Sequence, residues 1–236
     1  MELAQISQPP VDSLHSQAAL ILVPVYNAAP YLSELISRLR QFVCEDNLLF
    51  VNDGSTDNSL EILEAEKVHV LSFDKNQGKG AALQAGFDYT IRKGYRSVLT
   101  VDADLQHLPE ELPRFYAKDN GRRLLMGTRN ISLEVMPFDR WLTNNLTSMI
   151  ISIFSSQRVR DSQSGYRLIP VSLLKEIPLR TIKYDLESEI LFKAGVAGCS
   201  VGEVAISTVY AGSHSFINPV KDTLRFIRQI WTRIWA

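Results

Sequence analysis

Residues 97–107 have the sequence SVLTVDADLQH, an apolar run that ends in two aspartates. A short run of this kind is typical of a strand that is covered on both faces of a sheet. Asp102 and Asp104 follow the run directly, and side chains two apart in an extended segment point the same way. The stretch therefore predicts a buried strand at Ser97–Val101 that brings two carboxylates to one edge of a sheet.

The same pattern of an apolar strand and a polar exit recurs along the first half of the chain. Helical segments separate the strands, and the one expected at Gly80–Arg92 is followed by Gly94, a residue suited to end a helix. This alternation predicts an α/β fold, a single Rossmann-like, mostly parallel sheet flanked by helices. The expected strands are Ala18–Val25, Leu48–Val51, Val68–Phe73, Ser97–Val101 and Leu124–Met126.

The second half of the chain is less regular. The segments expected there are helices at Asp139–Phe154, Tyr184–Ala197 and Asp222–Trp235, and strand pieces at Tyr166–Pro170 and Val201–Val209. Neither a repeat nor a low-complexity segment divides the chain. We therefore expect one domain over residues 18–212, between a flexible tail (1–17) and a C-terminal loop and helix (213–236).

Composition narrows the functional class. The chain has 236 residues, of which 45% are hydrophobic and 22% charged, as in ordinary globular proteins. A net charge of -1 argues against a nucleic-acid partner. Cys44 and Cys199 favour separate thiols over a disulfide framework. The first 17 residues lack a signal-peptide pattern, and the apolar run Leu146–Phe154 is shorter than the roughly 20 residues of a spanning helix, so we expect a cytoplasmic protein.

Polar segments, two of which contain glycine, follow the first four expected strands. In an open parallel sheet, ligands bind beyond the carboxyl ends of the strands, and these ends share one edge. The four segments are Pro24–Asn27, Asn52–Asp57, Asn76–Gly80 and Asp102–His107. The sequence therefore predicts one composite site at this edge.

The Asp-x-Asp pair is the sharpest chemical signal in these segments. Two carboxylates with open coordination positions suit Mg²⁺ or Mn²⁺ carrying substrate phosphates, and Gln106 could add an oxygen or a metal-bound water. An isolated Asp-x-Asp is also typical of a solvated turn. Its place at the end of an apolar strand favours the metal site.

Two other segments are open to more than one interpretation. Asp53 could accept hydrogen bonds from a base or a ribose, or it could belong to a strand-to-helix turn that Asp57 caps. Lys79, between two glycines, could approach a phosphate or lie in a flexible turn. The chain has neither the Gly-x-Gly-x-x-Gly of dinucleotide enzymes nor a Walker motif, which disfavours both of those classes.

Taken in order, six segments resemble the family 2 glycosyltransferases, in particular the dolichyl- and polyprenyl-phosphate mannose synthase-like branch. They are LVPVYN, VNDGSTDNS, NQGKGAALQAG, VDADLQHLPEEL, GTRN and DSQSGYR. The resemblance covers about residues 19–210. It implies a GT-A fold, a nucleotide-sugar donor, Mg²⁺ or Mn²⁺, and inversion at the anomeric carbon.

The resemblance also implies roles for individual residues. The residues expected at the donor are Pro24, Tyr26, Asp53, Ser55, Lys79, Asp102 and Ala103, and those expected at the metal are Asp102, Asp104 and Gln106. The chain departs from the family pattern at Ala28, where an acidic residue often follows the Tyr-Asn pair. The choice between GDP and UDP is therefore left open.

The acceptor decides which further residues the reaction needs. A phosphate monoester is already anionic and needs cations, whereas a hydroxyl acceptor needs a general base. The resemblance implies that Arg129, Arg140 and Ser164 bind the acceptor phosphate, with Asp161 as the base if the acceptor is a hydroxyl. Asp104, Arg129 and Asp161 are the expected catalytic residues. The acidic stretch Asp185–Glu189 is interpreted mainly as capping and structural.

The expected C-terminal helix has an apolar half and a basic half, which is typical of a helix at a membrane surface or of one packed on a protein. We therefore expect a metal-dependent, inverting glycosyltransferase that moves a hexose to a polyprenyl phosphate and is peripheral at the inner face of the cell membrane. Transfer to a saccharide or lipid hydroxyl is one alternative. An inactive nucleotide-binding or scaffold module is another.

Overall fold

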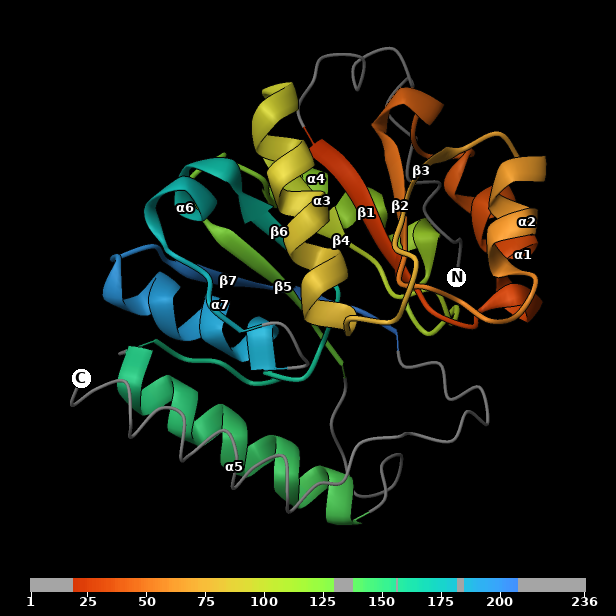
Figure 1. Cartoon of the computed structure of the whole chain (residues 1–236). Helices are drawn as coiled ribbons and strands as arrows, with labels where there is room; N and C mark the ends of the chain where they lie inside the picture. The colour runs from red at the N-terminus through yellow and green to blue at the C-terminus, as the bar shows by residue number, and fades with distance from the viewer. Residues whose placement is uncertain (1–18, 130–137, 156, 182–184, 208–236) are drawn as a thin grey trace, which may run out of the picture.

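A seven-stranded sheet in the order β3-β2-β1-β4-β6-β5-β7 forms the centre of the molecule (Figure 1). The computed structural model describes residues 19–129, 138–155, 157–181 and 185–207. The strands are β1 (Ala19–Val25), β2 (Leu48–Asn52), β3 (His69–Ser72), β4 (Ser97–Thr100), β5 (Leu124–Thr128), β6 (Arg167–Pro170) and β7 (Val201–Ala205). The Rossmann-like, mostly parallel sheet predicted from the sequence is confirmed.

Helices connect most of the strands. They are α1 (Ala29–Leu39), α2 (Ser59–Ala65), α3 (Lys79–Lys93), α4 (Leu112–Lys118), α5 (Phe138–Ser155), α6 (Val171–Glu176) and α7 (Asp185–Val196), with short 3₁₀ turns η2 (Glu45–Asn47) and η3 (Pro109–Glu111). As predicted, α3 ends at Gly94, whose φ of 76° is left-handed. The sequence did not predict α6. The tail, residues 213–236 and the expected helix at Asp222–Trp235 lie outside the described residues.

The direction of β6 determines what meets at the carboxyl edge of the sheet. The pairs β1–β2, β2–β3, β1–β4 and β5–β7 are parallel. β6 is antiparallel to both β4 and β5. The loop that precedes β6, residues 161–166, therefore lies beside the residues that follow β4 and β5.

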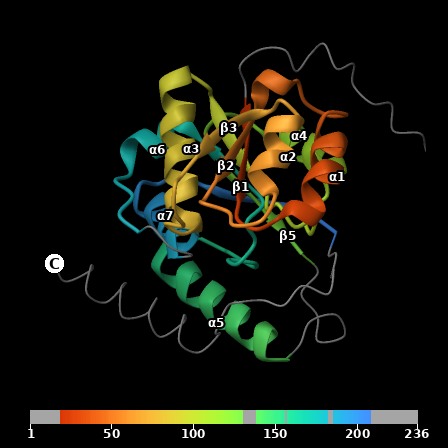
Figure 2. The ribbon, with the colours of Figure 1, turned by 45° about the vertical axis from the view of Figure 1, so that its right-hand side comes forward.

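Two apolar layers cover the sheet, one on each face. On β1, Ile21 and Val23 belong to the core that α1, α2 and α4 cover, whereas Leu20 and Leu22 belong to the core under α3, α6 and α7. Figure 2 shows these two groups of helices on opposite sides of the sheet. The prediction of a strand buried on both faces is therefore confirmed for β1, whose core leucines and isoleucine are fully buried.

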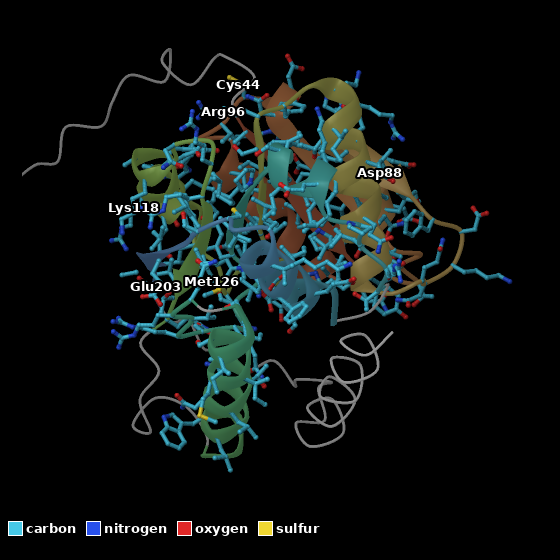
Figure 3. The ribbon with its side chains drawn as sticks, turned by 90° about the vertical axis from the view of Figure 1, so that its left-hand side faces the viewer. Cys44, Asp88, Arg96, Lys118, Met126 and Glu203 are labelled. Carbon is cyan, nitrogen blue, oxygen red and sulfur yellow. The ribbon has the colours of Figure 1, made fainter. Side chains whose placement is uncertain are left out.

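Two negative findings concern the described part of the chain. None of its helices combines the length and the apolarity needed to cross a bilayer. Neither Cys44 nor Cys199 is in a disulfide, as the composition predicts. Figure 3 shows Cys44 at the end of the molecule opposite α5.

The close packing of α3 against β1 at Gly86 leads to the first testable prediction. An added Cβ at Gly86 would lie 2.2 Å from Cδ1 of Leu22, inside a packed core. We expect Gly86→Val to lower the free energy of unfolding by about 1–3 kcal/mol, because overpacking forces core side chains to shift. Urea denaturation measures this loss. The control is Arg92→Val on the exposed face of the same helix, and an equal loss in that variant would contradict the packing explanation.

Candidate active site

Side chains from five segments meet at the carboxyl edge of the sheet. Lys79 is the first residue of α3, and Glu187 is in the first turn of α7. Asp102 and Asp104 follow β4, whereas Arg129 follows β5. The loop before β6 completes the edge, so residues far apart in the sequence form one site.

The ammonium of Lys79 lies between two carboxylates. Its Nζ atom is 2.6 Å from Oδ1 of Asp102 and 3.1 Å from Oε1 of Glu187. Burial lowers the pKa of Lys79, but the charges of Asp102 and Glu187 outweigh burial and raise the pKa above its ordinary value. Lys79 is therefore a fixed cation at the edge, and the alternative of a flexible turn is wrong for this residue.

Asp102 is held in place from several directions. Burial raises its pKa, but Lys79 and, after it, His107 outweigh burial and hold the pKa at about 2. The main-chain N–H of Asp102 donates to Nδ1 of His107 (3.2 Å), whose ring stacks on Tyr166. A Cβ added at Gly165 would lie only 2.7 Å from Oδ2 of Asp102, so the loop needs glycine at this position.

Asp104 is bound by its neighbour Gln106. The main-chain N–H of Gln106 donates to Oδ1 of Asp104 (3.1 Å), and its side-chain amide donates to Oδ2 (2.7 Å). Burial, followed by the charge of Asp102, raises the pKa of Asp104. Such a raised pKa marks a site where a cation would stabilise the charged form.

The donor set suits a metal ion that takes part of its coordination from a ligand. Within the described ranges, no group of three or more His, Cys, Asp or Glu side chains is arranged to hold a metal ion. Two carboxylates, Asp102 and Asp104, nevertheless lie together at the predicted position, and Mg²⁺ is commonly bound by one or two carboxylates plus substrate phosphates. The residues present therefore fit Mg²⁺ or Mn²⁺ held jointly with a phosphate ligand.

Asp53, expected at the nucleoside, shapes a loop in this structure. Its two carboxylate oxygens accept hydrogen bonds from the main-chain N–H groups of Gln77 (2.7 Å) and Gly78 (2.9 Å), and the residue is buried. Asp57 is expected from the sequence to cap the next helix, but the N-cap of α2 is Asn58, which makes no side-chain cap hydrogen bond. Asp57 instead fixes the turn before it, where it accepts hydrogen bonds from the main-chain N–H groups of Ser59 (3.0 Å) and Ala29 (3.1 Å). The loops after β2 and β3 are therefore fixed by side-chain carboxylates.

The other residues expected at the donor lie along the same edge. Oγ of Ser55 accepts a hydrogen bond from the main-chain N–H of Asn27 (3.0 Å), which ties the exits of β1 and β2 together. Pro24 is in β1, and Tyr26 follows that strand with 49% of its surface exposed. Ala103 is buried between the two aspartates. The exposed ring of Tyr26 is thus available to a ligand.

Arg129 and Asp161 form a buried ion pair. Nε of Arg129 lies 2.7 Å from Oδ2 of Asp161, and Nη2 lies 2.8 Å from Oδ1. The main-chain N–H of Arg129 also donates to Oδ2 (3.2 Å), and Asp161 is fully buried. The sequence suggests separate roles for these residues, whereas the structure joins them.

Arg167 fixes the loop that contains Ser164. Its buried guanidinium donates to the carbonyl oxygens of Ser162 and Ser164, each at 2.7 Å, and to that of Glu187. Oγ of Ser164 is buried and has no hydrogen-bond partner in the described part of the chain. Arg140, also expected at the acceptor, is in α5, and its side chain is outside the described part.

Sequence reasoning misses Glu187. The acidic stretch before and within α7 gives a signal, but it does not distinguish its members. Glu189 is structural as expected, because its carboxylate accepts hydrogen bonds from the main-chain N–H and the hydroxyl of Thr181. Glu187 instead faces Lys79, and only the fold brings these two residues together.

The ion pair of Lys79 makes a testable prediction about Asp102. In Lys79→Met we expect the pKa of Asp102 to rise well above 2, because burial then acts without the opposing ammonium. In the unaltered chain the lowered pKa stabilises the fold above about pH 4, and this contribution is lost as the pH falls toward 2. Carboxyl ¹³C NMR titration measures the pKa. Lys93→Met, on the exposed last turn of α3, should leave it unchanged.

Comparison with known proteins places this site in a family. Residues 20–177 match the family model described as Glycosyl transferase family 2. The chain is 29% identical over 213 residues to the polyprenol monophosphomannose synthase of Mycolicibacterium smegmatis, covering 85% of this chain and 80% of the relative. It is 30% identical over 201 residues to the undecaprenyl-phosphate mannosyltransferase of Micrococcus luteus, covering 80% of this chain and 83% of that relative.

A solved structure supports the fold independently. The glucosyl-3-phosphoglycerate synthase of Mycobacterium tuberculosis, in complex with Mn²⁺, UDP-glucose and phosphoglyceric acid, superposes with a TM-score of 0.73. It is 17% identical and the match covers 96% of this chain and 85% of that one. At this identity the likeness shows a shared GT-A-like fold. With the family match over most of the sheet, it follows that the chain belongs to glycosyl transferase family 2 and is a glycosyltransferase.

Proposed function

We propose that this glycosyltransferase moves a hexose from a GDP- or UDP-sugar to a polyprenyl phosphate, with inversion at the anomeric carbon and with Mg²⁺ or Mn²⁺ bound. The observation that carries the proposal is the meeting of Asp102 and Asp104 with the fixed ammonium of Lys79 at one edge of the sheet. The names of two relatives support a polyprenol or undecaprenyl phosphate as acceptor. The complex of the structural neighbour supports a nucleotide sugar and a divalent metal.

The donor half of the site stabilises a departing diphosphate. Asp102 and Asp104 would hold the metal ion, which neutralises negative charge on a leaving nucleotide when it is bound. Lys79 places a further positive charge beside Asp102 without needing to reorganise, because two carboxylates already fix its position. Pro24, Tyr26 and Ser55 lie at the exits of β1 and β2, where the nucleoside would bind, and Asp53 would support this site by fixing the loop at Gln77 and Gly78.

The acceptor half favours a phosphate over a hydroxyl. A phosphate monoester brings its own negative charge, so it needs a cation such as Arg129 and no base. A hydroxyl acceptor would need Asp161 as the base, but both oxygens of Asp161 accept hydrogen bonds from Arg129. Taking up a proton there would disrupt a buried bidentate ion pair. Asp161 therefore serves best to orient Arg129 toward an anionic acceptor.

The surface of α5 supports a lipid acceptor. Its protein-facing side is mixed, because the polar residues Asn144, Thr147, Ser148 and Ser155 are buried there together with the core residue Ile151. Its outer side carries an apolar row, here called the α5 stripe, formed by Leu142, Leu146, Met149 and Ile153 with exposed fractions of 49%, 39%, 54% and 66%. A surface helix usually turns its apolar residues toward the core, so an exposed row of four is unusual. Figures 1 and 2 show α5 beyond the edge of the sheet to which β1 and β2 point.

An apolar outer face is suited to the interface of a bilayer. We infer that the α5 stripe and the predicted C-terminal helix together bring the enzyme to the cytoplasmic surface of the membrane that contains its acceptor. The basic half of that predicted helix, which includes Arg225 and Arg228, would face the lipid headgroups. The enzyme would then be peripheral.

Loss of Asp104 tests the proposed reaction. The unaltered chain, given labelled GDP- or UDP-sugars, Mn²⁺ and undecaprenyl phosphate, is expected to form a charged, acid-labile lipid-linked sugar. Asp104→Ala should reduce this turnover by at least about 100-fold, because it removes one of two carboxylates at the metal position, while the circular dichroism spectrum stays the same.

The matched control is Asp88→Ala, which removes an exposed carboxylate on α3 that Figure 3 labels. This variant should keep full activity. Undiminished turnover in Asp104→Ala would contradict the metal role. A product that is neutral and stable to acid would favour the hydroxyl acceptor instead.

The α5 stripe makes a separate prediction. We expect Met149→Gln combined with Ile153→Gln to reduce co-sedimentation with phosphatidylglycerol vesicles several-fold, because each change removes apolar surface from the interface. Deletion of Lys221–Ala236 should reduce it as well. Val196→Gln replaces an exposed apolar side chain outside the stripe and is the control. Sedimentation that none of these changes alters would refute the interfacial role.

A further inference from the structure

Glu187 contacts both halves of the site. Its carboxylate accepts a hydrogen bond from Lys79 on the donor side at 3.1 Å. Its main-chain carbonyl accepts a hydrogen bond from Arg167, which also holds the Ser164 loop on the acceptor side. Only 14% of the Glu187 side chain is exposed. The residue is thus fixed in place at the junction of the two halves.

Lys79 and a divalent cation would compete for Asp102. The ammonium is 2.6 Å from Oδ1 of Asp102, and the absence of a side chain at Gly165 leaves Oδ2 unobstructed on that side. Two cations at one carboxylate repel each other. The Lys79 side chain is only 20% exposed, so its ammonium cannot reach bulk water without a rearrangement of the site. A second anion within reach of Lys79 removes this conflict, and Glu187 is in that position.

The charges of the site agree with this arrangement. Asp102, Asp104 and Glu187 set three carboxylates against one ammonium, which leaves two negative charges. That remainder matches one divalent cation. Without the charge of Glu187, only one negative charge would remain, and the ammonium would depend on Asp102 alone.

We propose that Glu187 is a positioning residue that retains the Lys79 ammonium when Asp102 binds the divalent cation, so that lysine and metal occupy the site together. This inference rests on the proposed function, since it assumes a metal at Asp102. Glu187 acts through Lys79 and needs no contact with the sugar. Its effect must therefore depend on Lys79 being present.

The test is Mn²⁺ binding to the full chain with UDP or GDP present, measured from the electron paramagnetic resonance signal of free Mn²⁺ against samples that contain the nucleotide without the protein. We expect Glu187→Gln to weaken binding by about ten-fold, because Lys79 then competes for Asp102 without an alternative partner. Lys79→Met should strengthen binding, because it removes the competitor. In the Lys79→Met background, Glu187→Gln should change the affinity by no more than about two-fold.

Two further variants separate positioning from a general effect on folding or charge. Glu187→Asp keeps the charge and should restore most of the affinity. Glu189→Gln removes a carboxylate from the same helix, but one that binds Thr181 and Lys193, so it should lower the melting temperature without changing Mn²⁺ affinity.

The inference is overturned if Glu187→Gln leaves Mn²⁺ binding unchanged. It is equally overturned if that substitution weakens binding to the same extent with and without Lys79, because Glu187 would then act by its own charge. An unaltered chain that binds no Mn²⁺ even with the nucleotide present would refute the metal-dependent function and this inference together. If the unaltered chain binds Mn²⁺ and Glu187→Gln binds it equally well, only this inference is refuted.

Discussion

Compensation of buried charge at the carboxyl edge of the sheet is the constraint on which the site depends. Burial of a carboxylate or an ammonium is costly unless an opposite charge lies close by. Lys79 meets this need for Asp102 and Glu187, and Arg129 meets it for Asp161. Asp104 has no such ion pair among the described residues and instead binds Gln106, which agrees with its raised pKa. The most weakly compensated carboxylate thus lies where a divalent cation is expected.

The topology of the sheet makes this arrangement possible. A parallel β6 would place the loop before it at the opposite edge, away from Arg129 and Asp102. Because β6 runs antiparallel, Asp161 reaches Arg129 and the main chain at Gly165 lies against Asp102. One reversed strand therefore brings Asp161 and the loop before β6 to the edge at which the parallel strands end.

The sequence predicts those features that local patterns encode. Apolar runs predicted β1, β2 and β4 with bounds that differ by one residue from the observed ones. The position of Asp102 and Asp104 after β4 followed directly from that prediction. The direction of β6, the loop-shaping role of Asp53 and the contact of Glu187 with Lys79 did not follow. Each depends on contacts between distant segments; Lys79 and Glu187 are 108 residues apart. Spacing and periodicity carry no information about such contacts.

Helix α5 shows where a local rule and the tertiary structure diverge. Its sequence satisfies the helical pattern, and its bounds agree with the prediction, yet four of its polar side chains are buried beside Ile151 while the α5 stripe is exposed. In α3 the same hydrophobic residue types, such as Leu83 and Phe87, face the core. Exposing the α5 stripe to water costs free energy, and the folding of the chain gives no reason for these four side chains to be exposed. An apolar surrounding, such as the lipid phase that holds a polyprenyl chain, would remove that cost and would explain why this row is exposed.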